Sequence, residues 1–256
     1  MNFTDTHTHL YDEAYSDDID ITVSRAIEAG VTKMVLPDID SKTRESMFSL
    51  ASRYPGITFP CAGLHPTEVR ENWRDEADLL MQAAGRKEIV AIGESGMDLY
   101  WSKDFIREQE EVFRIQVELA IKLDIPIIIH NRDATEITLK ILEDYRGRGL
   151  KGVFHAYGGS IETFRTLERY GDLYVGIGGV VTFRKASIAE TIKEIPVERI
   201  VTETDSPWLT PAPHRGKRNE SSYIPLIAGK IAEQKGISIE QVAETTSANA
   251  HKLFRI

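Results

Sequence analysis

The chain has 256 residues, with 31 Lys plus Arg against 40 Asp plus Glu, which gives a formal net charge of −9 with histidine neutral. This balance argues against a protein that coats nucleic acid through an excess of cations. Hydrophobic residues make up 41% and charged residues 28%, as in ordinary globular proteins, so the chain can bury a sizeable core. The single cysteine, Cys61, excludes an intramolecular disulfide and a cysteine-based zinc cluster, and we expect it to be a buried structural thiol.

The amino-terminal residues contain neither a basic start nor an apolar segment of the kind found in signal peptides. The most apolar run, residues 125–129, is far shorter than the roughly 20 residues that a membrane-spanning helix needs. We therefore expect a cytoplasmic protein that does not bind membranes and has no evident obligate protein partner.

Eight short apolar runs alternate with longer amphipathic patterns along the whole chain, which is typical of parallel strands joined by helices. The clearest helix is predicted at 105–123, where apolar residues recur at spacings near 3.6. A last helix is predicted to begin with a capping box, Ser238 to Gln241, and to cover the outside of the sheet. Strands are predicted at residues 3–6, 33–37, 58–63, 89–93, 126–129, 152–154, 173–177 and 200–203.

Eight such units without a linker or a change of composition favour an α/β fold of the (β/α)8 TIM-barrel type, formed by one domain over residues 1–256 and closed by the last helix. An open doubly wound sheet is the alternative, and it would usually carry a glycine-rich nucleotide fingerprint. The nearest match, Gly176 to Gly179, has Val181 where the third glycine should stand, so this alternative is disfavoured.

Five of the seven histidines directly follow predicted strands, where the carboxyl ends of barrel strands build the active site. Two carboxylates, Glu94 and Asp205, follow strands in the same way. Any one of these residues alone is more simply explained as a structural histidine or a salt-bridged acid. Their shared position instead predicts a metal centre. The candidate ligands are His7, His9, Glu94, His130, His155 and Asp205.

Six candidate ligands are too many for one catalytic ion that keeps an open position, so we expect two divalent ions. A carboxylate can bridge two cations, and Glu94 is the candidate for that role. Mixed imidazole and carboxylate ligation suits Zn²⁺ or Mn²⁺, whereas Mg²⁺ prefers oxygen, so the three metals remain open.

Several segments, spread in order over nearly the whole chain, resemble the TatD family of metal-dependent deoxyribonucleases. They include Asp5 to Leu10, Gly63 to Pro66, Gly93 to Asp98, His130 to Asp133, His155 to Ser160, Glu203 to Pro207 and Arg215 to Glu220. The resemblance implies a metallo-dependent hydrolase barrel with metal ligands at the six positions above, and DNA as substrate, often cut as a 3′ to 5′ exonuclease. The chain departs from the family pattern at Ser95, Asn131 and Ser221, none of which is a candidate ligand.

In the mechanism that we expect, His7, His9 and Asp205 hold the first ion, His130 and His155 hold the second, and Glu94 holds both. Glu94 and Asp205 are thus the catalytic residues, with Asp205 orienting or deprotonating the attacking water. Other residues are expected to contact substrate or to support the ligands: His65, Arg132, Glu203, Arg215, Lys217 and Arg218.

Some of these roles have alternatives. His65 is expected to contact phosphate or to support a ligand rather than to bind an ion. Glu203 either orients a ligand or forms a salt bridge in the barrel. Arg132 and the loop from Arg215 to Arg218 are expected to hold a phosphate backbone. Tyr100 and Trp101, after the fourth predicted strand, either stack a base or pack against a loop.

The predicted substrate is the end of a DNA strand, single-stranded rather than duplex. The nearest rival is a small-molecule esterase, lactonase or amidase of the same superfamily, against which the basic loop argues because a neutral ester offers nothing for three cations to hold. A non-catalytic metal-binding module is a more distant rival, because structural ions are normally closed off by protein ligands.

Overall fold

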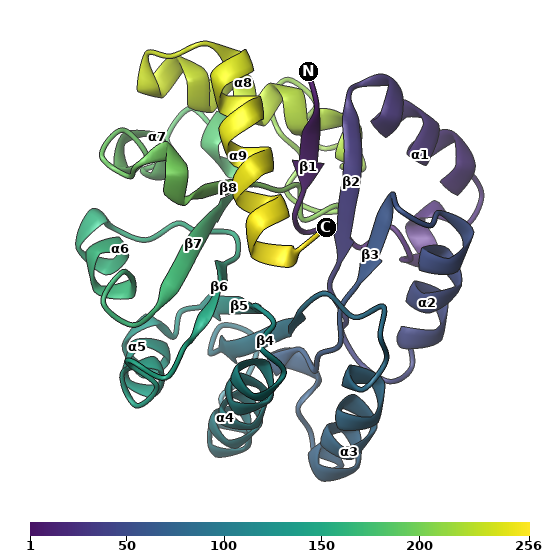
Figure 1. Cartoon of the computed structure of the whole chain (residues 1–256), viewed down its shortest axis with the longest axis vertical. Helices are drawn as coiled ribbons and strands as arrows, with labels where there is room; N and C mark the ends of the chain where they lie inside the picture. Colours follow the sequence, from purple (N-terminus) through teal and green to yellow (C-terminus); the bar gives the residue numbers. More distant parts are fainter.

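The structure, a computed structural model, describes all 256 residues and forms a ring of parallel strands surrounded by helices (Figure 1). The strands are β1 (Phe3–Asp5), β2 (Val31–Leu36), β3 (Thr58–Pro60), β4 (Ile92–Asp98), β5 (Ile127–Arg132), β6 (Lys151–Phe154), β7 (Asp172–Ile177) and β8 (Ile200–Thr202). They pair in chain order as β1 to β3 and as β4 to β8. Two parallel bridges, Ala62 with Ile92 and Thr8 with Ser206, join the two sheets into a closed barrel. The predicted barrel is confirmed.

All helices except α9 lie outside the ring of strands, and the longer ones bury an apolar face against it. In α4, for example, Val112, Phe113 and Val117 are fully or almost fully buried. The helices are α1 (Ile19–Glu28), α2 (Arg44–Arg53), α3 (Trp73–Ala84), α4 (Ile106–Leu123), α5 (Thr135–Glu143), α6 (Ile161–Leu167), α7 (Ile188–Thr191), α8 (Ile224–Lys235) and α9 (Ile239–Phe254). None of them has both the length and the hydropathy required to cross a bilayer.

Two strands that carry site residues are longer than the sequence predicted. The prediction ended them at residues 93 and 129, but β4 continues to Asp98 and β5 to Arg132 because these polar residues still pair across the two strands. Glu94 and His130 therefore lie within strands and not in the loops after them. The apolar sequence pattern ends where the site residues begin, but the backbone pairing between β4 and β5 continues past that point.

The sequence predicted that the last helix covers the outside of the barrel. In the structure this helix lies across the amino ends of the strands (Figure 1). The Asn249 amide donates to the backbone oxygens of Val197 and Ile200, at the start of β8. The residues of α9 at this end, Ala250, Leu253 and Phe254, form an apolar cluster with side chains from seven successive barrel segments: Val35, Cys61, Ala91, Ile128, Val153, Tyr174 and Val201. α9 thus closes this end of the barrel, and the polar cavity lies at the other.

The amino end of α9 is capped as predicted. The Ser238 hydroxyl accepts from the Gln241 amide N–H at 3.1 Å, and the Gln241 side chain accepts from the Ser238 N–H at 3.0 Å. The pair satisfies two backbone donors that the first helical turn leaves free, which fixes where the helix starts.

Candidate metal centre

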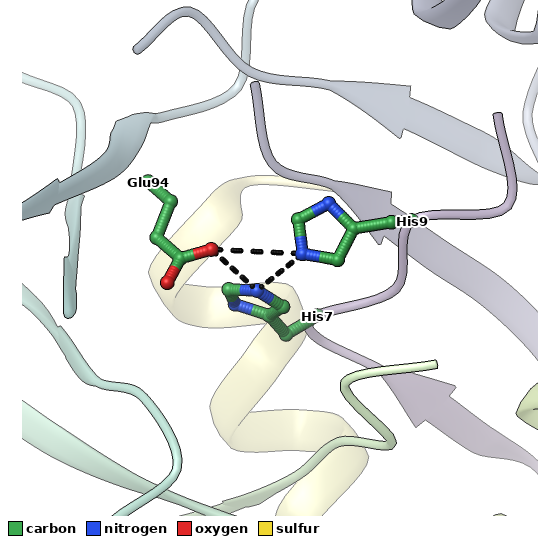
Figure 2. A group of neighbouring side chains, drawn as sticks. All are labelled: His7, His9 and Glu94. Carbon is green, nitrogen blue, oxygen red and sulfur yellow. Dashed lines mark hydrogen bonds and ion pairs between the residues drawn. The ribbon is translucent and has the colours of Figure 1, made fainter. Parts of the chain in front are cut away.

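Four side chains from three strand ends converge at the carboxyl end of the barrel. His7 Nε2 lies 3.0 Å from Glu94 Oε2 and 3.1 Å from His9 Nε2, and all three residues are buried (Figure 2). Asp205 Oδ1 lies 3.7 Å from each of the two histidine Nε2 atoms. Ligand atoms about 2.1 Å from a tetrahedral ion stand about 3.4 Å apart. The spacing and the mixed nitrogen and oxygen donors therefore fit a divalent cation.

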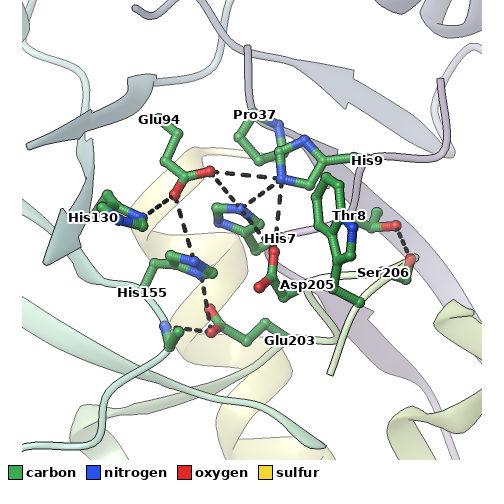
Figure 3. Close-up of polar contacts among 12 residues, drawn as sticks. His7, Thr8, His9, Pro37, Glu94, His130, His155, Glu203, Asp205 and Ser206 are labelled. Atoms are coloured by element: carbon green, nitrogen blue, oxygen red, sulfur yellow. Dashed lines mark hydrogen bonds and ion pairs between the residues drawn. The ribbon is translucent and has the colours of Figure 1, made fainter. Parts of the chain in front are cut away.

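The other oxygen of Glu94 faces a second group of donors. Glu94 Oε1 lies 2.7 Å from His130 Nδ1 and 3.5 Å from His155 Nε2 (Figure 3). His65 Nε2 lies 3.3 Å from the same oxygen and 3.3 Å from His130 Nδ1. Each carboxylate oxygen of Glu94 thus belongs to a different ligand group, which is the arrangement expected of a bridge. His65 belongs to this group as well, because it forms with Glu94 and His130 a set of donor atoms that could hold a metal ion.

Two buried carboxylates stand behind the histidines of the second group. Asp98 Oδ2 lies 3.0 Å from His130 Nε2, and Glu203 Oε1 lies 3.1 Å from His155 Nδ1. An imidazole that donates its rear N–H to a carboxylate keeps the lone pair of its other nitrogen free for a cation. Glu203 also accepts from the Ala156 N–H at 2.6 Å, which fixes its carboxylate in place.

Asp98 and Tyr11 are functional candidates that sequence reasoning missed. The Tyr11 hydroxyl lies 3.0 Å from His9 Nδ1 and donates to the backbone oxygen of Pro37. Both residues were visible as polar groups two to four positions from a predicted ligand. Only the fold shows that Tyr11 contacts the His9 ring, and Asp98 the His130 ring, on the side that faces away from the candidate metal centre.

The electrostatics of the cluster favour bound positive charge. Burial raises the pKa of Asp205 to about 6, although His155 and His9 act in the opposite direction. Burial lowers the pKa of His155, but the nearby carboxylates, Glu203 first, outweigh it and raise that pKa to about 10. Every salt bridge of Glu94, Asp205 and Glu203 goes to a histidine and none to a lysine or arginine. A divalent cation would supply the positive charge that no lysine or arginine provides to these carboxylates.

The metal centre opens into a cavity of about 520 Å³. Of its lining residues, Arg132 is the one lysine or arginine, and its guanidinium stacks on the Tyr100 ring at 3.8 Å. A larger hollow of about 780 Å³ beside α2 is lined by no histidine, so we place the site in the smaller one. The lining residues of the smaller cavity are His9, Ile39, His65, Thr67, Glu68, Glu94, Asp98, Trp101, His130, Arg132, His155, Asp205, Trp208 and Leu209.

The basic loop after β8 does not line this cavity, so a substrate contact of Arg215, Lys217 or Arg218 would lie outside it and stays a prediction. Two Arg218 nitrogens donate to Asp18 at 2.8 and 2.7 Å, so this guanidinium ties the loop to the start of α1. The guanidinium of Arg215 stacks on Phe183 at 3.7 Å. A run of basic residues in a sequence does not show which groups those residues contact in the fold. Here Arg215 and Arg218 both contact other side chains of the protein.

The chain is similar to known metal-dependent hydrolases over its whole length. The family model described as TatD related DNase matches residues 4–255. A Bacillus subtilis protein named "Uncharacterized metal-dependent hydrolase YabD" is 39% identical, over 98% of each chain. The Salmonella typhimurium protein named 3′-5′ ssDNA/RNA exonuclease TatD is 34% identical, over 98% of each chain.

A comparison with solved structures leads to the same family. The crystal structure of YjjV, a TatD homolog from Escherichia coli, superposes with a TM-score of 0.91 and 25% identity, over 99% of this chain and 98% of that one. Family model, relatives and structure agree with the resemblance of the motifs. The chain belongs to the TatD family of metal-dependent hydrolases.

Proposed function

We propose that this hydrolase cleaves phosphodiester bonds of DNA with two divalent ions, removing nucleotides from single-stranded ends in the 3′ to 5′ direction. The proposal rests on the position of Glu94, whose two carboxylate oxygens lie within 3.6 Å of two separate groups of histidine nitrogens. Two relatives named 3′-5′ ssDNA/RNA exonuclease, at 33% and 34% identity, support the substrate and the polarity.

The residues would divide between the ions as their contacts suggest. His7, His9 and Asp205 would hold the first ion, and Glu94 would hold both. His130 and His155 would hold the second. The hydrogen bond to Asp98 would keep His130 in the right tautomer, and Glu203 lies 3.1 Å from His155 Nδ1. Bound here, the ions would neutralise the phosphate and make a water acidic enough to attack at neutral pH.

The remaining steps fall to the protein itself. Asp205 faces the cavity with 16% of its side chain exposed, so its carboxylate can accept the proton of a water placed there. Arg132 faces the same cavity and would hold the non-bridging oxygens of the phosphate, a contact for which a guanidinium is well shaped. Because Arg132 is the one lysine or arginine that lines the cavity, we expect it to favour a phosphodiester over a neutral ester.

The test compares substrates and metals directly. End-labelled single-stranded DNA, and separately aryl esters and lactones, are incubated with purified protein and Mg²⁺, Mn²⁺ or Zn²⁺. We expect stepwise shortening of the DNA from its 3′ end. Cleavage confined to the esters would overturn the proposal and favour the small-molecule hydrolase.

A variant pair tests the role of Asp205. Asp205→Asn should abolish turnover while the protein stays folded, because an amide cannot accept the proton. The control is Asp144→Asn, the same change on the surface, where Asp144 pairs with Arg114 at 2.8 Å. If Asp205→Asn keeps the rate of the control, Asp205 is not the catalytic group.

A further inference from the structure

Two large aromatic side chains stand exposed at the rim of the metal cavity. Trp101, after β4, is 68% exposed and Trp208, after β8, is 48% exposed, and both line the cavity. Tyr100 and Leu209 beside them are also exposed. Exposed apolar groups gathered around a polar cavity mark a surface that a ligand covers.

The backbone under each tryptophan is fixed. On one side Asp98 Oδ1 accepts the N–H groups of Tyr100 at 2.9 Å and Trp101 at 3.1 Å, while its other oxygen contacts His130. This single carboxylate therefore positions both a candidate ligand and an exposed ring. A ring on a fixed backbone loses little conformational freedom when a ligand stacks on it.

The second tryptophan is tied to the centre in the same way. The Trp208 N–H donates to the Asp205 backbone oxygen at 2.9 Å, and the Trp208 oxygen accepts from the Asn219 side chain at 2.5 Å. Its ring packs edge-on against His9, with centroids 5.2 Å apart. The backbone of both tryptophans, and the ring of Trp208, are thus held at a set position relative to the donors of the metal centre.

The cation of the cavity belongs to the same surface. Arg132 stacks on Tyr100 at 3.8 Å and lies 5.4 Å from the centroid of Trp101. The rim of the cavity therefore carries exposed aromatic rings and one guanidinium, and the candidate metal ligands lie deeper in the cavity. The matching ligand carries a flat ring and a phosphate a few bonds apart, which is the chemistry of a nucleotide and not of a simple ester.

We infer that Trp101 and Trp208 form a stacking subsite for the unpaired terminal base of a nucleic acid strand, with Arg132 on the adjoining phosphate. The inference rests on the proposed nuclease function and names the groups that select its substrate. Stacking accepts any base, since each has a π-face, so the subsite selects unpaired ends without a base preference. A base inside a duplex is already stacked and paired and cannot enter.

The fluorescence of the protein gives a readout that does not depend on turnover. The chain has three tryptophans, and the third, Trp73 in α3, is only 6% exposed and lies outside the cavity. The metal-loaded protein is titrated with a short single-stranded oligonucleotide whose terminal linkage is a phosphorothioate that resists cleavage. A matched oligonucleotide has an abasic sugar at the 3′ end.

Binding of the natural end should quench the fluorescence in the native protein and equally in the control Trp73→Phe. Trp101→Ala and Trp208→Ala should each raise the Kd for the natural end about tenfold to hundredfold. The Phe variants should retain most of the affinity. The abasic end should bind all variants equally, because it has no base to stack.

Two results would overturn the inference. One is an equal loss of affinity for natural and abasic ends, which would show that the tryptophans act through the fold. The other is the absence of any quenching by the natural end in the native protein. Failure of the proposed function would look different: an unmodified oligonucleotide would stay intact in the cleavage assay, whatever the binding titration shows.

Discussion

Gly176, near the end of β7, supplies no candidate metal ligand, yet we predict that Gly176→Ala weakens metal binding. Glu203 occupies the space beside this glycine. A Cβ atom at position 176 would lie 2.5 Å from the Glu203 carboxyl carbon and 3.0 Å from its Oε1. Real Cβ contacts are not this short, so the Glu203 carboxylate must move away from His155 Nδ1, which it now contacts at 3.1 Å.

The expected magnitudes follow from this displacement. Loss of the carboxylate behind a ligating histidine typically reduces metal affinity about tenfold to hundredfold. Overpacking of a buried site costs about 1–3 kcal/mol of stability, which a folded barrel should tolerate. Metal affinity is measured by calorimetric titration of the metal-free protein with Zn²⁺ or Mn²⁺, and stability by urea unfolding of the same samples.

The neighbouring glycine provides the control. A Cβ at Gly178 would meet nothing closer than 3.6 Å, so Gly178→Ala should leave metal affinity unchanged. If Gly176→Ala and Gly178→Ala bind metal equally well, Glu203 does not position His155. The one ion pair of Glu203, with His155, would then stabilise the barrel rather than the metal centre.

Three further predictions concern single side chains. Asp98→Asn should lower the affinity for one of the two ions about tenfold to hundredfold, seen as one weakened step in the metal titration, because a neutral amide replaces the charged acceptor behind the His130 ring. Phe254→Ala, which removes a buried ring of the apolar cluster at the amino end of the barrel, should cost about 3 kcal/mol in urea unfolding, and a loss under 1 kcal/mol would show that α9 is not needed there. Arg218→Ala should cost about 1 kcal/mol without changing KM, and a raised KM at unchanged stability would return Arg218 to substrate binding. Because the hydrogen bond from Arg218 lowers the pKa of Asp18 to about 2, the stability that this pair adds is complete above the ordinary pKa of 3.8, and the difference between Arg218→Ala and the native protein should vanish as the pH falls from 4 to 2.

The barrel could be predicted from the sequence because strand and helix patterns alternate strictly, and a closed ring turns strand ends far apart in sequence into neighbours. The same rule brought His7, Glu94, His130 and His155 together. The strand limits could not be predicted at β4 and β5, because a polar residue such as Glu94 ends an apolar pattern without ending the ladder of backbone hydrogen bonds.

Other features depend on partners that the sequence pattern does not identify. The amphipathic pattern of α9 shows that one face is buried, but not which surface covers it. The charge of Arg218 is equally suited to a phosphate and to Asp18, and only the packing of the loop against α1 decides between them. Asp98 looked like one acid among many until β4 and β5 placed it behind His130.

The central claim is that Glu94 bridges two divalent ions. The most direct measurement is the number of ions bound per chain, by calorimetric titration and elemental analysis of the metal-free protein, for the native chain and for Glu94→Gln. We predict two ions for the native protein and a loss of tight binding at both positions in Glu94→Gln, with the fold intact by circular dichroism. A single ion whose affinity is the same in Glu94→Gln would contradict the account.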